Sequence, residues 1–260
     1  MQRSIRLVFS GLFVAVCLTV AALPAAAQGG QSNIVRVYST EAKDVAQFEQ
    51  GRVRHVEFHK KQGDAWTWYT WQVETGEDTG AYLTATFGHK WADFDAWDAK
   101  FAEADGVDAA KNLTPYTEES SNWFAVTLTE VSGTAGMSPE GPSSLTQLLH
   151  FNVRIGKERE FNNNLRKIHE AIQKTKWGGN NYVWYARADG GTLSEYVLAI
   201  PLKNWAEMEG PETPFPAMLE KAFGRTEAQA TLDSFDSCVS RIWSEVLRYR
   251  KDLSHIPAAK

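Results

Sequence analysis

The sequence predicts an α+β protein in which one β-α-β-β-α-β unit occurs twice, and three observations support this prediction. A shift of 114 residues brings distinctive side chains of the first half onto like side chains of the second. Apolar residues alternate over short segments and recur at helical spacing between them, in the same order in both halves. A segment rich in Gly, Pro and Ser, residues 132–144, separates the halves and is typical of an exposed linker.

The internal repeat rests on side chains that match without a gap. The matched positions are Arg52 with Arg166, His55 with His169, Gly76 with Gly190, Tyr82 with Tyr196 and Trp91-Ala92 with Trp205-Ala206. Trp is a rare residue, and in both copies an acidic residue follows the Trp-Ala pair, which composition alone does not explain. We interpret the halves as divergent copies of one unit.

Each copy begins with a predicted strand and a predicted helix. The segments 33–39 and 148–154 alternate between apolar and polar residues, as a strand with one buried face does. In the second copy a helix is predicted by an apolar stripe at helical spacing, formed by Phe161, Leu165, Ile168 and Ile172. The first copy has a similar stripe at Val45, Phe48 and Val56.

Two strands joined by a turn, a second helix and a closing strand complete each copy. The paired strands are predicted at 66–74 with 80–87 and at 182–188 with 194–202, with Gly76 and Gly190 in the turns. The second helix is predicted near Trp91 and near Trp205, and the closing strands at 123–131 and 241–249. The second copy adds an insertion around 210–216 and an extra helix near 227–236.

This element order is that of the ferredoxin-like unit, whose sheet has helices on one face and needs a partner on the other. Together with the Trp-Ala-acid repeat, it resembles the dimeric α/β-barrel superfamily in its tandem-repeat form, in which two such units pack their open sheet faces together. The resemblance implies repeat 1 at 28–131 and repeat 2 at 145–260, packed as an α/β barrel. Antibiotic-biosynthesis monooxygenases, NIPSNAP-like proteins and haem-binding chlorite dismutase relatives share this fold, so the resemblance supports an architecture more than an activity.

The first 27 residues have the order of a secretory signal peptide. Arg3 and Arg6 precede an uncharged run, residues 7–23, which Pro24 and three alanines follow. We expect cleavage near Ala27 and a periplasmic or secreted protein. The alternative is a retained anchor, because the run is near the lower length limit for a membrane span.

The composition of the predicted mature chain limits its partners. It has 25 basic against 32 acidic side chains, a net charge of −7, and no basic cluster, so nucleic acid is not an expected partner. No second apolar run is long enough to cross a membrane. Cys238 is its single cysteine, so no internal disulfide can form. The oligomeric state is not predicted.

Ten Trp, eight Tyr and thirteen Phe indicate an aromatic-rich core or an aromatic-lined cavity. Because side chains alternate along a strand, Trp66 and Trp68 are expected on one sheet face and Tyr69 and Trp71 on the other. Core packing explains most of these residues. The alternative is a chamber between the sheets for a small apolar or aromatic molecule, with the ligand-binding candidates Trp68, Tyr69, Trp71, Tyr82, Trp184, Tyr185 and Tyr196.

Arg52, His55 and His59 line one edge of the first predicted helix, and the second copy has Arg166, His169 and Gln173 there. A neutral His can act as a general base and an Arg can hold an anionic group, so the catalytic candidates are His55, Arg52, His169 and Arg166. His55 and His59 could supply two metal ligands, but the sequence shows no third, and we predict no metal site. The alternative to catalysis is a hydrogen-bonded helix edge present in both copies.

Haem is a minor alternative that the resemblance to chlorite dismutase relatives implies, with His169 at the position to ligate iron. The pattern of that family is not recognisable around His169, and no Cys-x-x-Cys-His motif is present, so we predict no cofactor. The sequence therefore predicts an exported protein that binds a small apolar or aromatic molecule between its sheets, and it leaves open whether the protein is an enzyme. The alternative is a cofactor-independent monooxygenase-like enzyme with His and Arg in the barrel.

Overall fold

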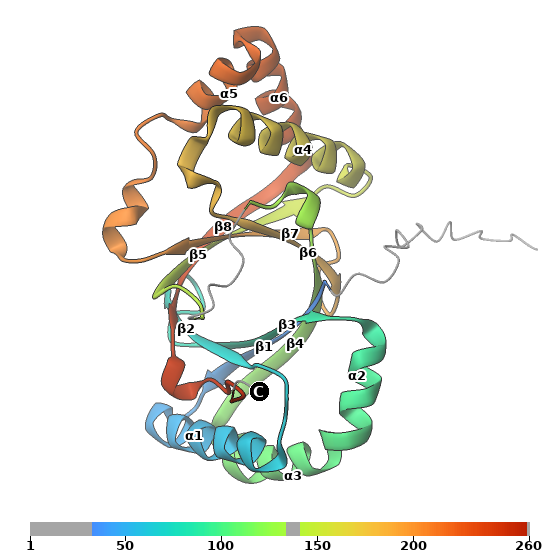
Figure 1. Cartoon of the computed structure of the whole chain (residues 1–260), viewed down its shortest axis with the longest axis vertical. Coiled ribbons are helices and arrows are strands. Elements are labelled where there is room, and N and C mark those ends of the chain that lie inside the picture. The colour runs from blue at the N-terminus through green and yellow to red at the C-terminus, as the bar shows by residue number, and fades with distance from the viewer. Residues whose placement is uncertain (1–32, 134–140, 259–260) are drawn as a thin grey trace, which may run out of the picture. The chain divides into compact units, whose positions relative to one another are not determined.

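The first half of the protein has the predicted order of strands and helices. The computed structural model describes residues 33–133 and 141–258, so the predicted signal peptide and much of the linker lie outside the described residues. The elements of the first half are β1 (Ile34–Ala42), α1 (Val45–Gln62), β2 (Tyr69–Thr75), β3 (Tyr82–His89), α2 (Trp91–Trp97), α3 (Glu103–Asn112) and β4 (Thr117–Thr127) (Figure 1). A π-helical turn, Asp98–Ala102, joins α2 to α3 in one helical run.

The second half repeats this order of strands and helices. Its elements are β5 (Leu145–Val153), α4 (Glu158–Thr175), β6 (Val183–Asp189), β7 (Glu195–Leu202), α5 (Phe215–Phe223), α6 (Arg225–Cys238) and β8 (Val239–Tyr249). At Trp205, where the sequence predicts a helix, the chain makes only a short 3-10 turn, Trp205–Glu209. Gly210 and Pro211 end this turn, and helical structure resumes in α5 directly after Pro214. The predicted extra helix is α6.

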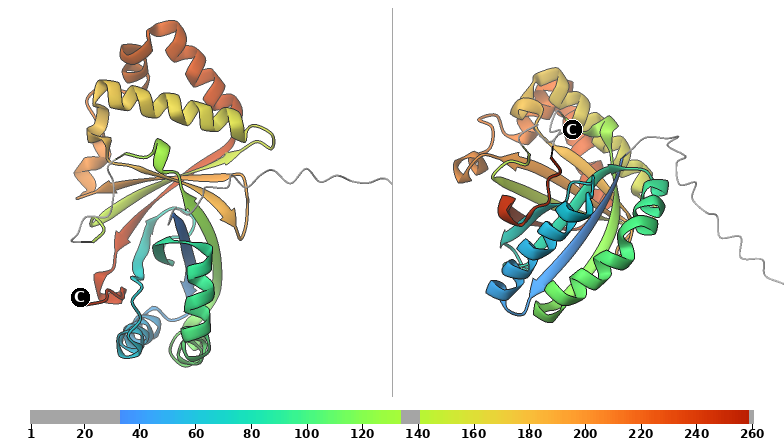
Figure 2. Two further views of the ribbon diagram at one scale, coloured as in Figure 1. Left: turned by 45° about the vertical axis from the view of Figure 1, so that its right-hand side comes forward. Right: turned by 60° about the horizontal axis from the view of Figure 1, so that its bottom comes forward.

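The eight strands close into one barrel in the order β1-β3-β2-β8-β5-β7-β6-β4. In each half the first strand pairs with the third and the fourth: β1 with β3 and β4, and β5 with β7 and β8. The halves join where β2 pairs with β8 and β4 with β6. Helices α1 to α3 cover one side of the barrel and α4 to α6 the opposite side (Figure 2). The predicted fold, two ferredoxin-like repeats packed as an α/β barrel, is confirmed.

The strands begin up to six residues from the predicted starts, and β2 and β4 show why. β2 begins at Tyr69 rather than Trp66, because the Trp66 N–H is held by the Asp64 carboxylate and Trp68 makes only a single bridge, to His255. β4 begins at Thr117, ahead of the predicted start. The first residues of β4 pair with β1 through their backbones while their side chains are polar and mostly exposed, so a search for apolar alternation misses them.

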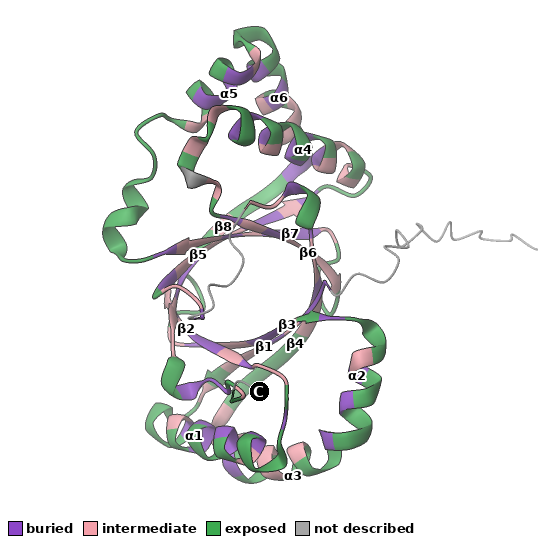
Figure 3. Ribbon diagram, viewed as in Figure 1, coloured by how far each residue is buried: buried purple, intermediate pink, exposed green. Residues whose placement is uncertain are grey.

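Alternation along the strands divides the apolar residues between the barrel interior and its outer face. The interior cluster comprises Val35, Val37, Trp71, Val73, Ala81, Ala85, Ala125 and Leu247. The largest core lies outside the barrel under α4, α5 and α6, where Phe161, Leu165, Met218 and Leu219 are at most 1% exposed. Figure 3 shows buried residues on the strands and on parts of the covering helices. Burial of this core provides most of the hydrophobic stabilisation of the second half.

The helix-covered side of the first half is different, because several buried residues there are polar. Arg52, His55, His59 and Asp64 are each less than 9% exposed, and all lie on α1 or directly after it. Buried polar groups require partners. This side of the molecule therefore holds the candidate site. No helix within the described residues is long and apolar enough to cross a membrane.

Candidate metal centre

Helices α1 and α3 approach each other closely, and a glycine permits the approach. A Cβ atom added to Gly51 would lie 1.8 Å from the backbone oxygen of Asn112, far inside any contact distance that real side chains show. One turn further along α1, His55 Nδ1 lies 2.8 Å from Asp108 Oδ1, one turn earlier in α3. The helices therefore run antiparallel, and their polar edges face each other.

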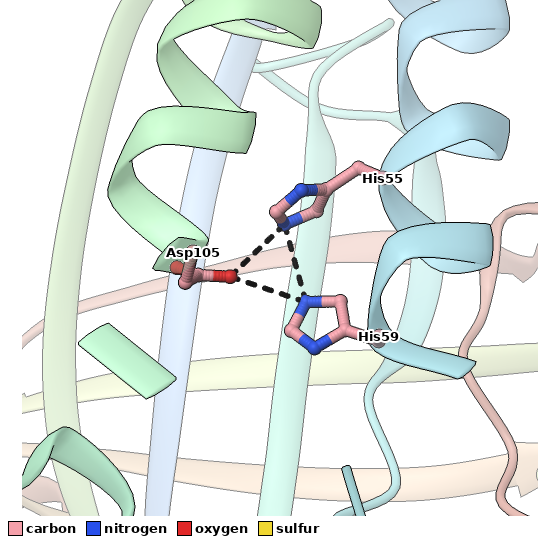
Figure 4. A group of neighbouring side chains, drawn as sticks. All are labelled: His55, His59 and Asp105. Carbon is pink, nitrogen blue, oxygen red and sulfur yellow. Dashed lines mark hydrogen bonds and ion pairs between the residues drawn. The ribbon is translucent and has the colours of Figure 1, made fainter. Parts of the chain in front are cut away.

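Three side chains meet at the next contact between these helices. His55 Nε2 and His59 Nε2 lie 3.2 Å apart, and Asp105 Oδ1 lies 3.4 Å from the first and 3.3 Å from the second. Figure 4 shows the three groups pointing toward one another, with the histidines on α1 and the aspartate on α3. Their ligand atoms lie close enough together to bind one metal ion. Among the described residues, no other group of His, Cys, Asp and Glu side chains has this spacing.

Carboxylates hold the other nitrogen of each imidazole ring. His55 Nδ1 lies 2.8 Å from Asp108 Oδ1, and His59 Nδ1 lies 2.9 Å from Asp64 Oδ2. Because a carboxylate can only accept, each Nδ1 donates its proton, and in the neutral form of each ring Nε2 presents a lone pair. The hydrogen-bond network thus assigns the same tautomer to both rings. This is the arrangement that orients histidine ligands in metal sites.

Asp64 is itself fixed by donors from the loop after α1 and from α2. Its carboxylate accepts hydrogen bonds from the Trp66 N–H at 3.0 Å, Trp68 Nε1 at 3.0 Å and Trp97 Nε1 at 3.2 Å. Burial raises the pKa of Asp64, but its hydrogen bonds with His59, Trp66 and Trp68 outweigh burial and lower it. An ionised, immobile carboxylate therefore orients the His59 ring.

The carboxylate of the cluster has one oxygen that no donor among the described residues satisfies. Asp105 Oδ1 is buried and accepts no hydrogen bond from any described residue. Burial raises the pKa of Asp105, and burial together with the charges of Arg52 and His59 lowers the pKa of His55 to about 3. His55 is thus uncharged at neutral pH. With both rings neutral, two nitrogen lone pairs and a carboxylate oxygen would face one point, and a cation bound among them would offset their repulsion.

A cavity of about 420 Å³ lies beside the cluster, between α1, α3 and the outer face of the first sheet. All three cluster residues line it, as do Arg52, Tyr38, Trp68 and Trp97. A small molecule in this cavity could reach the cluster. The arrangement can therefore hold a metal ion and present it to a ligand.

The structure places the catalytic candidates of the two copies in different surroundings. Arg52 and His55 are buried and line the 420 Å³ cavity. Their counterparts do not line it: Arg166 is exposed and bonded to Asn163, and His169 is half-buried with Nδ1 2.8 Å from the Tyr182 hydroxyl. Arg and His thus line a common cavity on α1 and not on α4, and this cavity lies outside the barrel.

The seven aromatic candidates are divided between several places. Trp71 and Tyr185 line a second cavity, of about 300 Å³, inside the barrel, and Tyr69 packs against the interior cluster. Trp68, Tyr82, Trp184 and Tyr196 occupy the alternate strand positions and pack on the outer face instead. The strand period of two separates neighbours such as Trp184 and Tyr185, so one chamber cannot hold the whole set.

Sequence reasoning missed the three acids of the site, Asp64, Asp105 and Asp108. A signal existed, because Asp105 and Asp108 are spaced to lie on one edge of the helix that follows Trp91. Nothing local shows that this edge faces α1, however. The close packing at Gly51 brings Asp105 and Asp108 to the histidines, whereas Asp64 directly follows α1.

The residues around His169 do not fit haem. Its imidazole is bonded to Tyr182, and the space between α4 and the sheet is filled by the core that includes Phe161 and Leu165. His169 lines neither the 420 Å³ cavity nor the barrel cavity. An axial ligand needs an open side on which the porphyrin can lie, and the core occupies that space.

Comparison with known proteins shows the fold. No protein-family model matches the sequence, and no curated protein does so. A proposed monooxygenase from Lactobacillus acidophilus NCFM has a similar structure, with a TM-score of 0.55 and 9% identity over 86% of this chain and 97% of that one. A proposed monooxygenase from Fusobacterium nucleatum gives a TM-score of 0.53 and 10% identity over 86% and 94%. Chlorite dismutases and a heme-binding protein from Thermus thermophilus also match, with TM-scores below 0.5. At these identities the likeness extends to the barrel fold and not to the activity.

Proposed function

We propose that the first half of the protein binds Zn²⁺ through His55 Nε2, His59 Nε2 and Asp105 Oδ1. The observation that supports this most strongly is the triangle of potential ligand atoms, with edges of 3.2, 3.3 and 3.4 Å. Two imidazoles and one carboxylate, each imidazole backed by a second carboxylate, are the ligand set of a catalytic zinc site.

The size of the triangle favours zinc over harder ions. A tetrahedral zinc at about 2.0–2.1 Å from each ligand requires ligand atoms about 3.3 Å apart. An octahedral Mg²⁺ at about 2.1 Å would bring neighbouring ligands to about 3.0 Å and would prefer oxygen to nitrogen. Iron(II) also uses two His and one carboxylate, as non-haem oxygenases do, so metal analysis of the isolated protein has two informative outcomes.

Three protein ligands leave one tetrahedral position for water or a substrate atom. A zinc ion with such a position acts as a Lewis acid on a carbonyl oxygen or lowers the pKa of bound water to about 7. Because the ligands line the 420 Å³ cavity, a molecule held there can become the fourth ligand. We infer a metal-dependent protein that binds a small molecule at zinc.

Zinc titration of chelator-treated protein tests this function. The native chain is expected to take up one equivalent, and His59→Gln, which places in α1 the residue type that α4 has at the matched position, is expected to weaken binding by more than about 100-fold. His169→Gln is the matched control and is expected to bind zinc as the native chain does. Failure of the native chain to bind one equivalent, or an equal loss in both variants, would overturn the proposal.

A second candidate function is binding of a small apolar molecule inside the barrel. It is supported by Trp71 Nε1, a buried donor without a hydrogen-bond partner among the described residues, which lines an otherwise largely apolar cavity of about 300 Å³. A ligand with one acceptor atom would satisfy it. We expect acetophenone to bind more tightly than ethylbenzene, and Trp71→Phe to remove this difference while Trp205→Phe, at an exposed position, retains it. Equal binding of both probes by the native chain would refute the role of the Trp71 donor, and binding of neither probe would exclude this function.

We further infer that the protein is exported, which the order of charged, apolar and small residues at its start supports. The mass of the protein isolated from its host tests this. A chain that begins at Gln28 is expected, and a chain that retains its first residues would contradict cleavage.

A further inference from the structure

Arg52 is a buried cation without an acidic partner. It is 7% exposed, and its guanidinium donates from Nε to the backbone oxygen of Leu253 at 3.1 Å and from Nη2 to Thr70 Oγ1 at 3.2 Å. Both acceptors are neutral. Burial lowers the pKa of Arg52 to about 10, which still leaves it charged at neutral pH.

Three other arginines that are not fully exposed pair with carboxylates. Arg187 pairs with Glu195, Arg248 with Glu74 and Arg250 with Glu49 and Asp252. No described carboxylate lies within ion-pair distance of Arg52. Asp105 is near enough to interact electrostatically with it, but a zinc ion would compensate that charge. With zinc bound, the positive charge of Arg52 is left for a ligand to balance.

Arg52 and the metal ligands face the same cavity. Arg52 lies one turn before His55 on the same edge of α1, and both line the 420 Å³ cavity with Asp105. A planar guanidinium matches the geometry of a carboxylate. With zinc bound, the cavity offers two adjacent positive groups. The zinc ion can take an oxygen atom as a ligand, and the Arg52 guanidinium can donate hydrogen bonds to an oxygen acceptor.

The body of the ligand would meet aromatic rings. Tyr38, Trp68 and Trp97 line the same cavity, with ring centroids 6.1 Å apart for Tyr38 and Trp68 and 5.8 Å apart for Trp68 and Trp97. Such a surface favours a flat apolar group over a hydrated aliphatic one.

We propose that this cavity takes a small aromatic carboxylate, with one carboxylate oxygen as the fourth zinc ligand and the other accepting hydrogen bonds from Arg52. The proposal rests on the zinc site proposed above. It assigns the substrate class by charge and shape, and it makes Arg52 the residue that distinguishes an acid from its neutral amide.

Calorimetric titration of the zinc-loaded protein with benzoate, benzamide and acetate tests the proposal. Benzoate is expected to bind at least about 30-fold more tightly than benzamide, which has the same shape without the charge, and more tightly than acetate, which lacks the ring. Arg52→Met is expected to weaken benzoate binding at least about 30-fold while zinc binding is retained. Arg166→Met, at the matched exposed position in α4, is the control and should bind benzoate as the native chain does.

The outcomes separate this proposal from the zinc site. If zinc does not bind, the proposed function fails and the substrate class falls with it. If zinc binds but benzoate and benzamide bind equally, or if Arg52→Met binds benzoate normally, the zinc site stands and the assignment of a carboxylate is wrong. Equal binding of acetate and benzoate would refute the aromatic part. The benzoate and benzamide comparison uses the native chain, so it is decisive even if Arg52→Met does not fold.

Discussion

Helices α1 and α4 carry the same Arg-x-x-His edge, yet they use it differently. On α1 the edge continues to the buried His59, and it faces the acids of α3. On α4 the matched residue is Gln173, which is exposed, and the helices packed beside α4 present the buried apolar residues Met218 and Leu219. The polar edge of α1 forms part of the candidate site, whereas the polar edge of α4 lies beside an apolar core.

One position shows why the neighbouring helices differ. Gly51 allows the backbone of α3 to approach α1, whereas the matched residue Leu165 fills the core under α4 and is 1% exposed. A glycine in a helix interior costs about 1 kcal/mol relative to alanine, so its presence in α1 needs a compensating reason. The repeat therefore sets the helix edge, and the packing partner decides whether that edge becomes a site.

The largest effect is expected when the carboxylate of the cluster is removed. Asp105→Asn should weaken zinc binding by more than about 100-fold and should raise the melting temperature of the metal-free protein. The amide can donate to an imidazole lone pair, and it replaces a buried carboxylate oxygen that has no donor. Zinc competition and thermal unfolding without metal measure the two effects. A lower melting temperature for the metal-free variant would mean that Asp105 serves the fold rather than a metal.

A smaller loss of zinc affinity is expected when the carboxylate that orients His55 is changed. Asp108→Asn should weaken zinc binding about 10- to 100-fold, because the carboxylate that orients and polarises His55 becomes neutral. Glu103→Gln, at an exposed position of the same helix, should leave the affinity unchanged. Chelator competition measures the zinc affinity of both variants. An equal loss of affinity in the two would mean that Asp108 contributes only through its negative charge.

The helix contact can be tested without altering a ligand. Gly51→Ala should destabilise the protein by about 1–3 kcal/mol and weaken zinc binding, because the new methyl group overlaps the backbone of Asn112. Gly106→Ala in α3, where an added Cβ has nothing within 4 Å, should be neutral or stabilising by up to about 1 kcal/mol. Denaturant unfolding compares them. If both substitutions had the same effect, close packing would not explain the glycine.

The smallest effect concerns a histidine of the second half. Burial lowers the pKa of His150, but its hydrogen bonds to Glu195 and Glu245 outweigh burial and raise it; Arg187 holds Glu195 from the next strand. A raised folded-state pKa stabilises the fold below the unfolded value of about 6.5, and this contribution is lost as the pH rises through the folded-state value. His150→Gln should therefore cost more unfolding free energy at about pH 5.5 than at about pH 9. A cost independent of pH would show that the charge of His150 does not stabilise the barrel.

Apolar periodicity and the internal repeat predicted most of the fold, because both can be seen in the sequence without knowledge of tertiary contacts. The stripe of Phe161, Leu165, Ile168 and Ile172 is the buried face of α4, and the paired strands lie close to the predicted segments. Closing of the barrel follows from the need to cover two open sheet faces. The polar start of β4 carried no such signal, since backbone pairing alone places it in the sheet.

The candidate site could be predicted only in part. Arg52, His55 and His59 share one helix, so their spacing reveals a common edge. Asp105 comes from another helix, and the contact that brings it to the histidines depends on the packing at Gly51. The aromatic candidates were grouped by residue type, whereas alternation along the strands divides them between the barrel interior and the outer clusters.

Anomalous diffraction at the zinc absorption edge, from crystals of the zinc-loaded protein, tests the central claim most directly. We expect a peak at about 2.0–2.2 Å from His55 Nε2, His59 Nε2 and Asp105 Oδ1, and none beside His169. Crystals that contain zinc but show no peak within this triangle, or that show it at His169 instead, would contradict the claim that α1 and α3 form the metal site.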